Sequence, residues 1–311
     1  MSQPQKQGDL TVTSDHRRQW RSCLYVYPVI SRRARGLSVG VNLNPDKRCN
    51  FSCVYCQINR RIRRELHEVR LDVLGEELGE ALQAVTSGEL WREERFCRTS
   101  EAMRRINDIA LSGDGEPTCL ANFDAAVQRV ADVKTRLGLD DVKIVLITNA
   151  SQLDQPQVLR ALEILDANNG EIWAKLDAGT EEYFRRTNRP RKGTTLAGIV
   201  RNITAAARGR PVVIQSLFLK IKGQPPSEGQ VAAYCVRLRE ILEAGGQIKL
   251  VQAHTIARSP ASASAGNLAD AELDAIAETI RTAVPGVPVE TFYGQDMPPQ
   301  ANAISPKNSG W

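Results

Sequence analysis

The chain of 311 residues lacks any long apolar segment. No run approaches the roughly 18 consecutive apolar residues that a membrane-spanning helix needs. Residues 1–20 also lack the apolar core of a secretory signal peptide. We therefore expect a cytoplasmic protein without membrane contact. In that reducing compartment, clustered cysteines indicate a metal site rather than disulfides.

The sequence also lacks the two cysteine pairs that are common in zinc sites. Three of its seven cysteines, Cys49, Cys53 and Cys56, lie within eight residues, and no fourth lies nearby in the sequence. Thiolates suit zinc or iron–sulfur clusters, and a [4Fe–4S] cluster normally takes four Cys, one for each iron. A cluster held by these three would keep one iron open for a ligand. A zinc knuckle is the less favoured alternative, because zinc usually takes four ligands.

The overall composition is that of a soluble globular protein, with 42% hydrophobic and 25% charged residues. The net charge of +5 is unevenly placed, because the segment 17–70 holds thirteen Lys or Arg against three acidic residues. This concentration fits an anionic partner such as RNA or a phosphorylated metabolite, and a solvated basic face is the alternative. We expect most of the scattered cysteines to be small buried hydrophobic residues: Cys23, Cys97, Cys119 and Cys235.

Short apolar segments alternate with longer segments of helical periodicity. Strands are predicted at 37–43, 109–111, 142–148, 171–176, 211–219 and 247–253, with a candidate seventh at 287–292. Helices are predicted at 72–85, 123–137, 155–167, 181–186, 196–207, 228–244 and 269–283. This α/β alternation implies a parallel sheet, and six or seven strands favour a partial parallel β/α barrel over a full one. We expect a single domain at 19–294, between a disordered N-terminal extension (1–18) and a C-terminal tail (295–311).

Polar residues gather where the predicted strands end, which is the edge that carries the chemistry in α/β barrels. The second strand ends in Ser112-Gly-Asp-Gly-Glu-Pro-Thr118. Its glycines would let a ligand approach the main chain closely, and the Glu116 carboxylate could accept hydrogen bonds from a ligand ammonium. An ordinary glycine-rich turn is the alternative, since the third glycine of a Rossmann fingerprint is missing.

Further polar residues end the later strands. Asn149 follows the third strand and is either a ligand contact or a helix cap. Lys175 and Asp177 share one face of the fourth strand, because side chains alternate with a period of two. They form either a buried ion pair or a ligand site, and Asp177 needs a partner because a lone buried charge is costly. Arg258, after the sixth strand, could bind a carboxylate or phosphate with its planar guanidinium.

The cysteine spacing, with the aromatic Tyr55 directly before Cys56, resembles that of the radical S-adenosylmethionine (SAM) enzymes. In that superfamily the open iron binds the amino and carboxylate groups of SAM. One electron from the reduced cluster cleaves SAM, and the resulting 5′-deoxyadenosyl radical abstracts hydrogen from a substrate. The resemblance implies a [4Fe–4S] cluster, SAM and a low-potential electron donor of the flavodoxin or ferredoxin type. Residues 112–116 resemble the Gly-Gly-Glu element that holds the methionine amino group.

The resemblance also implies roles for individual residues. The cluster ligands would be Cys49, Cys53 and Cys56. The residues expected to hold SAM are Tyr55, Ser112, Gly113, Gly115, Glu116, Asn149, Lys175 and Asp177. Those expected to contact an anionic substrate are Arg32, Arg33, Arg189 and Arg258. Radical formation needs no acid–base pair, so no further catalytic residue is assigned.

A narrower resemblance, to the bacterial and archaeal branch related to wyosine tRNA synthases, covers most of residues 26–260. It implies a tRNA or other nucleotide substrate, and it is carried by segments 28–42, 112–118, 175–179, 188–190 and 255–258. Wyosine-forming relatives carry a second cluster built from additional upstream cysteines, whereas only Cys23 precedes Cys49 here. Two other functions stay open: a glycyl-radical activase that acts on a partner protein, and a metal-stabilised RNA-binding module without catalysis.

Overall fold

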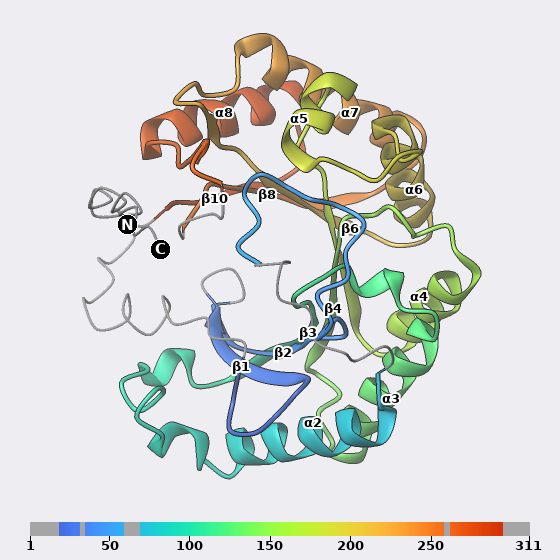
Figure 1. The fold of residues 1–311 in the computed structure, drawn as a ribbon, viewed down its shortest axis with the longest axis vertical. Coiled ribbons are helices and arrows are strands. Elements are labelled where there is room, and N and C mark those ends of the chain that lie inside the picture. The colour runs from blue at the N-terminus through green and yellow to red at the C-terminus, as the bar shows by residue number, and fades with distance from the viewer. Residues whose placement is uncertain (1–18, 32–34, 59–68, 258–261, 295–311) are drawn as a thin grey trace, which may run out of the picture.

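The structure is a computed structural model, and it describes residues 19–31, 35–58, 69–257 and 262–294 (Figure 1). The predicted extension (1–18) and tail (295–311) lie outside these residues. Three of the four predicted substrate contacts also lie outside them: Arg32, Arg33 and Arg258.

Eight strands form one sheet in the order β1-β2-β3-β4-β5-β6-β8-β10. Neighbours from β2 to β10 are parallel, whereas β1 pairs antiparallel with β2. The sheet is curved and stays open between β1 and β10, so it forms a half-barrel (Figure 1). The strands are β1 (Val26–Ser31), β2 (Gly36–Val41), β3 (Ile106–Leu111), β4 (Lys143–Thr148), β5 (Gly170–Lys175), β6 (Val212–Leu217), β8 (Ile248–His254) and β10 (Val289–Phe292).

Helices cover the convex face of the sheet (Figure 1). Each turns an apolar stripe toward the strands, as α3 does with the buried Phe123, Val127 and Val130. Side-chain caps fix some helix starts, because Thr180 accepts a backbone hydrogen bond at the start of α5 and Thr195 does so at the start of α6. The helices are α2 (Leu71–Thr86), α3 (Phe123–Arg136), α4 (Pro156–Ala167), α5 (Glu181–Asn188), α6 (Leu196–Gly209), α7 (Glu228–Glu243) and α8 (Asp270–Ala283).

On the concave face, a charged cluster around Glu171 joins the amino ends of β4, β5 and β8. The Glu171 carboxylate accepts hydrogen bonds from Lys143 Nζ at 3.1 Å and Trp173 Nε1 at 2.8 Å, and it also pairs with Lys249. Burial disfavours the ionised carboxylate, but the donors from Lys249, Trp173 and Lys143 outweigh that effect. The pKa of Glu171 therefore lies below its ordinary value.

Toward the carboxyl ends of the strands, the concave face becomes apolar and then polar. Val145, Trp173 and Val213 pack together. Strand alternation and the parallel register place Gln215 and Gln252 next on the same face, where Gln215 Nε2 donates to Gln252 Oε1 at 3.2 Å. The half-barrel thus carries polar side chains above an apolar layer at the edge where α/β barrels carry their chemistry.

The predicted fold class is confirmed, and a strand or helix is found in each predicted segment, including the seventh strand as β10. Two features were not predicted. The edge strand β1 is mostly buried, so it lacks the polar–apolar alternation that reveals a strand. A small antiparallel ribbon pairs β7 (Lys220–Ile221) with β9 (Ala265–Gly266), and two residues are too few to give a periodic signal.

Replacing Glu171 with Gln should destabilise the fold. We expect the free energy of unfolding at neutral pH to fall by about 1–2 kcal/mol, because charged hydrogen bonds are lost but the two lysines are half-exposed and screened by water. Because the pKa of Glu171 is lower in the folded state, its carboxylate stabilises the folded state at pH values above the unfolded pKa of about 4.3. This stabilisation is lost as the pH falls through the folded pKa. Urea unfolding curves of the two proteins should therefore converge in acid. The exposed Glu163→Gln serves as control, and equal stability of Glu171→Gln and wild type at neutral pH would contradict this role.

Candidate functional site

The three clustered cysteines lie in the loop that leaves the carboxyl end of β2, residues 49–56, called the cysteine loop below. Each thiol is partly buried. A turn in which Cys56 N–H donates to the Cys53 carbonyl at 3.0 Å shapes the end of the loop, and Phe51 N–H donates to the Cys49 sulfur at 3.5 Å. The three sulfurs therefore share one short loop at the carboxyl edge of the sheet.

One side of the cysteine loop is hydrogen-bonded to the end of α5. Ser52 N–H donates to the carbonyls of Asn188 and Arg189, at 3.2 and 3.1 Å. Val54 N–H donates to the Thr187 carbonyl at 2.9 Å. These bonds fix the backbone around Cys53.

The contact with α5 continues on the other side of Phe51. Arg191 N–H donates to the Asn50 carbonyl at 2.9 Å. Phe51 forms a β-bridge with Pro190 and packs its ring edge-on against Phe184, with ring centroids 5.6 Å apart. The stretch between the first two cysteines is therefore held by both backbone and ring contacts.

A second side of the loop is closed by the glycine-rich segment after β3. A Cβ atom at Gly115 would lie 1.8 Å from the Arg48 carbonyl oxygen, and one at Gly113 would lie 2.2 Å from Asn42 Oδ1. Glu116 N–H also donates to the Arg48 carbonyl at 3.2 Å. Gly115 therefore admits the Arg48 carbonyl and Gly113 admits the Asn42 side chain, and the expected contact of these glycines with a ligand stays a prediction.

The carboxylate of Glu116 joins the ends of β3 and β4. Glu116 is 3% exposed. Its Oε1 accepts from the hydroxyls of Thr118 and Thr148 at 2.6 Å each, and its Oε2 accepts from the Asn149 N–H at 2.7 Å. Burial raises the pKa of this carboxyl, while the hydrogen bonds oppose that rise. The contact with a ligand ammonium stays a prediction, for which Oε2 has a further lone pair.

Asn149 contacts the cysteine loop directly. Its Nδ2 donates to Asn50 Oδ1 at 2.8 Å, and its Oδ1 accepts from the Ser151 N–H at 3.0 Å. The N-cap residue of α4 is Gln155, so the alternative that Asn149 caps the next helix is wrong.

Asp177 anchors a third side of the loop. It is 4% exposed, and its Oδ1 accepts from the Leu217 N–H at 2.9 Å. Its Oδ2 accepts from Asn188 Nδ2 at 2.7 Å and from the Tyr55 hydroxyl. Lys175 Nζ lies 3.8 Å from Oδ1 and 5.2 Å from the centre of the Tyr55 ring. The buried charge thus has donors from the loop, α5 and β6, as its burial requires.

The Tyr55 hydroxyl and the Cys53 thiol, both near Asp177, have raised pKa values. Burial, and then the Asp177 charge, raises the pKa of the Tyr55 hydroxyl well above its ordinary value. The same two causes raise the pKa of the Cys53 thiol to about 12. Because the thiolate is the metal ligand, metal binding has to displace the proton of Cys53.

The buried side-chain atoms beside the cysteine loop that lack a hydrogen-bond partner within the described residues include the amide oxygens Asn188 Oδ1 and Asn44 Oδ1. Asn188 Nδ2 points to the Cys53 sulfur, 3.8 Å away, and Asn44 packs against Gly115. Since buried polar atoms are nearly always satisfied, these two indicate donors that a ligand would supply. SAM offers such donors in its ammonium, hydroxyl and amino groups, and thiols are the ligands of iron–sulfur clusters. The residues therefore fit a cluster with SAM.

The scattered cysteines are less buried than expected, since Cys97 and Cys119 are exposed. Cys119 ends the 3₁₀ turn η3 (Pro117–Cys119), and its N–H donates to the Glu116 carbonyl at 3.1 Å. Partial burial of the sulfur raises the pKa of the Cys119 thiol to about 12, with further contributions from Glu116 and Cys49. A fourth sulfur thus lies near the cysteine loop.

Arg189 is exposed beside the cysteine loop and adopts the left-handed conformation, with φ of 45°. Its contact with an anionic substrate stays a prediction. In the part of the chain that the structure describes, no group of three or more His, Cys, Asp or Glu side chains is arranged around a single metal ion. No described helix combines the length and apolarity needed to cross a membrane.

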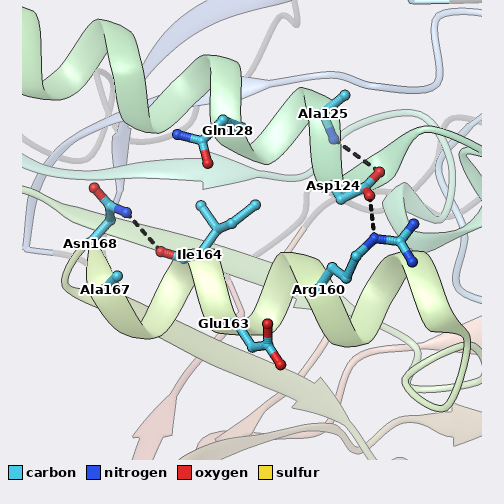
Figure 2. Close-up of a pocket in the computed structure, with 8 residues that line it drawn as sticks. All are labelled: Asp124, Ala125, Gln128, Arg160, Glu163, Ile164, Ala167 and Asn168. Carbon is cyan, nitrogen blue, oxygen red and sulfur yellow. Dashed lines mark hydrogen bonds and ion pairs between the residues drawn. The ribbon is translucent and has the colours of Figure 1, made fainter.

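A surface groove between α3 and α4 lies in the helical layer (Figure 2). Arg160 Nε donates to Asp124 Oδ2 at 2.7 Å at one end of it. None of its lining residues comes from the cysteine loop or a strand. We assign it no function.

Residues 43–232 match the family described as the Radical SAM superfamily. The match covers more than half of the chain, including the cysteine loop, the glycine-rich segment and Asp177. The protein therefore belongs to the radical SAM superfamily. Members use a [4Fe–4S] cluster and SAM, and they need a reductant.

Among curated proteins, the chain is similar to a UPF0026 protein of Methanocaldococcus jannaschii, with 30% identity over 178 residues, which are 57% of this chain and 48% of that protein. It is also similar to a UPF0026 protein of Helicobacter pylori, with 27% identity over 252 residues, covering 79% and 70% of the two chains. The chain thus spans about half the length of the first relative and more of the second.

Among solved structures, the fold is similar to a radical SAM methyltransferase from Sphaerobacter thermophilus, with a TM-score of 0.55 and 16% identity over 86% of this chain and 69% of that chain. It is also similar to Streptococcus suis SuiB bound to the precursor peptide SuiA, with a TM-score of 0.55 and 14% identity over 81% and 48% of the chains. At these identities the likeness shows the fold alone, so membership of the wyosine-related branch stays a prediction.

Gly115→Ala should prevent the cysteine loop from assembling, because the new methyl group would occupy the position of the Arg48 carbonyl. We expect the iron and sulfide content after anaerobic reconstitution to fall several-fold. Gly209→Ala is the matched control, since nothing lies within 4 Å of a Cβ atom at that position. Full iron and sulfide content in Gly115→Ala would show that this close approach is not needed.

Proposed function

We propose that Cys49, Cys53 and Cys56 hold the [4Fe–4S] cluster of this radical SAM enzyme and leave one iron open for SAM. The observation that carries the proposal is the cysteine loop itself. Three surrounding segments fasten it at the carboxyl edge of the half-barrel, and beside it lie buried acceptors for which the described residues supply no donor. A structural zinc site would not explain these acceptors.

When bound, the cluster and SAM supply the 5′-deoxyadenosyl radical, and the chain supplies orientation and exclusion of water. Glu116 Oε2 and the side-chain oxygens of Asn44 and Asn188, which lack a donor among the described residues, are suited to accept hydrogen bonds from SAM. Asp177 orients Asn188 and Tyr55, so its effect on SAM passes through their positions. The apolar layer beneath the polar edge limits water below the reacting groups.

The proposed substrate is anionic and of nucleotide type, with a tRNA base as the leading candidate. The basic residues of the segment 17–70 and the resemblance to wyosine tRNA synthases support this substrate class. The upstream cysteines of wyosine-forming relatives are missing, so we propose a modification other than wyosine.

Cys53→Ala should abolish both cluster and chemistry. We expect brown wild-type protein that releases 5′-deoxyadenosine when reduced anaerobically with SAM, and a variant that has lost its cluster and releases none. Cys97→Ala, which removes an exposed thiol, is the control and should behave as wild type. SAM cleavage by Cys53→Ala would exclude this ligand set, and colourless, zinc-loaded wild-type protein would favour the RNA-binding module.

Asp177→Ala should leave the three thiols in place but weaken SAM binding. We expect a dissociation constant raised about tenfold or more, which corresponds to at least about 1.4 kcal/mol, because Asn188 and Tyr55 lose their common acceptor. Equilibrium binding of SAM to reconstituted protein measures this, with the exposed Asp154→Ala as control. Unchanged SAM affinity at full iron content would count against the role of Asp177.

The substrate class is tested by comparing modified nucleosides in RNA from cells with and without the gene. The proposal predicts that one modified nucleoside disappears or that its precursor accumulates. Identical nucleoside profiles, together with a glycyl radical formed on a partner protein, would favour the activase.

A further inference from the structure

The segment Arg185-Arg-Thr-Asn-Arg-Pro-Arg-Lys192, called the basic segment below, carries five cations and no acidic residue in eight positions. It covers the end of α5 and the residues that follow. Thr187 and Asn188 are buried, whereas every Lys and Arg of the segment is exposed. One side of the segment therefore contacts the cysteine loop, and the other is a positively charged surface.

Most of this charge is not neutralised by the residues that the structure describes. Arg185 pairs with Glu181 at 2.7 Å. The other four cations form no ion pair with a carboxylate of the described residues: Arg186, Arg189, Arg191 and Lys192. Clustered like charges repel one another and favour an anionic partner.

The basic segment lies directly against the residues between the clustered cysteines. Its backbone binds Ser52, which donates to the Asn188 and Arg189 carbonyls, and Asn50, which accepts from the Arg191 N–H. A partner on the exposed side would therefore be separated from the cysteine loop by this one segment. That arrangement suits electron transfer, which needs proximity but no atomic contact, whereas a substrate must touch the radical itself.

We propose that the basic segment is the docking surface for an acidic one-electron carrier protein of the flavodoxin or ferredoxin type. The inference rests on the proposed function, since a cluster in the cysteine loop is what such a carrier would reduce. The reduced carrier loses one electron and the oxidised [4Fe–4S] cluster gains it, and no bond, proton or group is transferred. Electron-transfer contacts are small and are steered by opposite charge, which suits a short surface of high charge density.

The test reverses two charges, in Arg191→Glu/Lys192→Glu, without removing the backbone hydrogen bond of Arg191. Cluster reduction in reconstituted protein is followed by the loss of visible absorbance. The reductants are reduced flavodoxin, an acidic protein, and photoreduced 5-deazariboflavin, a small molecule without net charge. We expect the rate with flavodoxin at low salt to fall about tenfold or more, and the rate with deazariboflavin to stay unchanged.

The matched control, Arg136→Glu/Arg201→Glu, reverses two exposed cations on α3 and α6 and should keep both rates. Arg191→Gln/Lys192→Gln should give an intermediate rate with flavodoxin, and it replaces the charge-reversed variant if that one does not fold. High salt should lower the rate at which flavodoxin reduces the wild-type cluster, to a value close to the rates of the variants.

Equal rates of cluster reduction by flavodoxin in the wild type and in both variants of Arg191 and Lys192 would overturn the proposal. It would also be overturned if the control lost as much of this rate as the charge-reversed variant. Loss of binding to unfractionated tRNA with an unchanged flavodoxin rate would assign the segment to RNA and overturn it too. Because the readout is cluster reduction and not SAM cleavage, a failure of this proposal can be distinguished from a failure of the proposed function. If flavodoxin reduces the wild-type cluster but the wild type releases no 5′-deoxyadenosine, SAM cleavage is refuted and the docking proposal still holds.

Discussion

The hydrogen bonds to the Asp177 carboxylate tie the cysteine loop to the rest of the protein. One buried group accepts from Tyr55 of the loop, Asn188 of α5 and Leu217 at the end of β6. Burying a carboxylate is costly unless its donors are all in place, so the three segments have to be correctly positioned together. The conformation of a loop without regular structure thereby becomes coupled to the edge of a rigid sheet.

A second buried carboxylate repeats this arrangement on the other side of the loop. Glu116 links β3 to β4 through Thr148 and the Asn149 N–H, and Asn149 in turn contacts Asn50 of the loop. The parallel strand order brings both carboxylates to one edge. The same packing places the exposed charges of the basic segment next to the cysteine loop.

Sequence patterns were sufficient for the fold, because buried strands and amphipathic helices have local periodicities. They were also sufficient for the superfamily, because the spacing of the cysteines is itself the signal. Contacts between distant segments were not predictable. Tyr55 and Asp177 are 122 positions apart, the approach of Cys119 to the cysteine loop has no local signature, and a single asparagine such as Asn44 is chemically unspecific. A glycine such as Gly115 indicates that something approaches it but not what approaches: the structure shows the Arg48 carbonyl there, and contact with SAM stays a prediction.

The central claim is that three thiolates hold a cubic cluster whose fourth iron is open to SAM. Electron paramagnetic resonance of the anaerobically reduced protein tests this most directly, with and without added SAM. The account predicts the signal of a reduced [4Fe–4S] cluster and a clear change of that signal when SAM binds to the open iron. A cluster signal that SAM leaves unchanged, or reconstituted protein without any cluster signal, would contradict it.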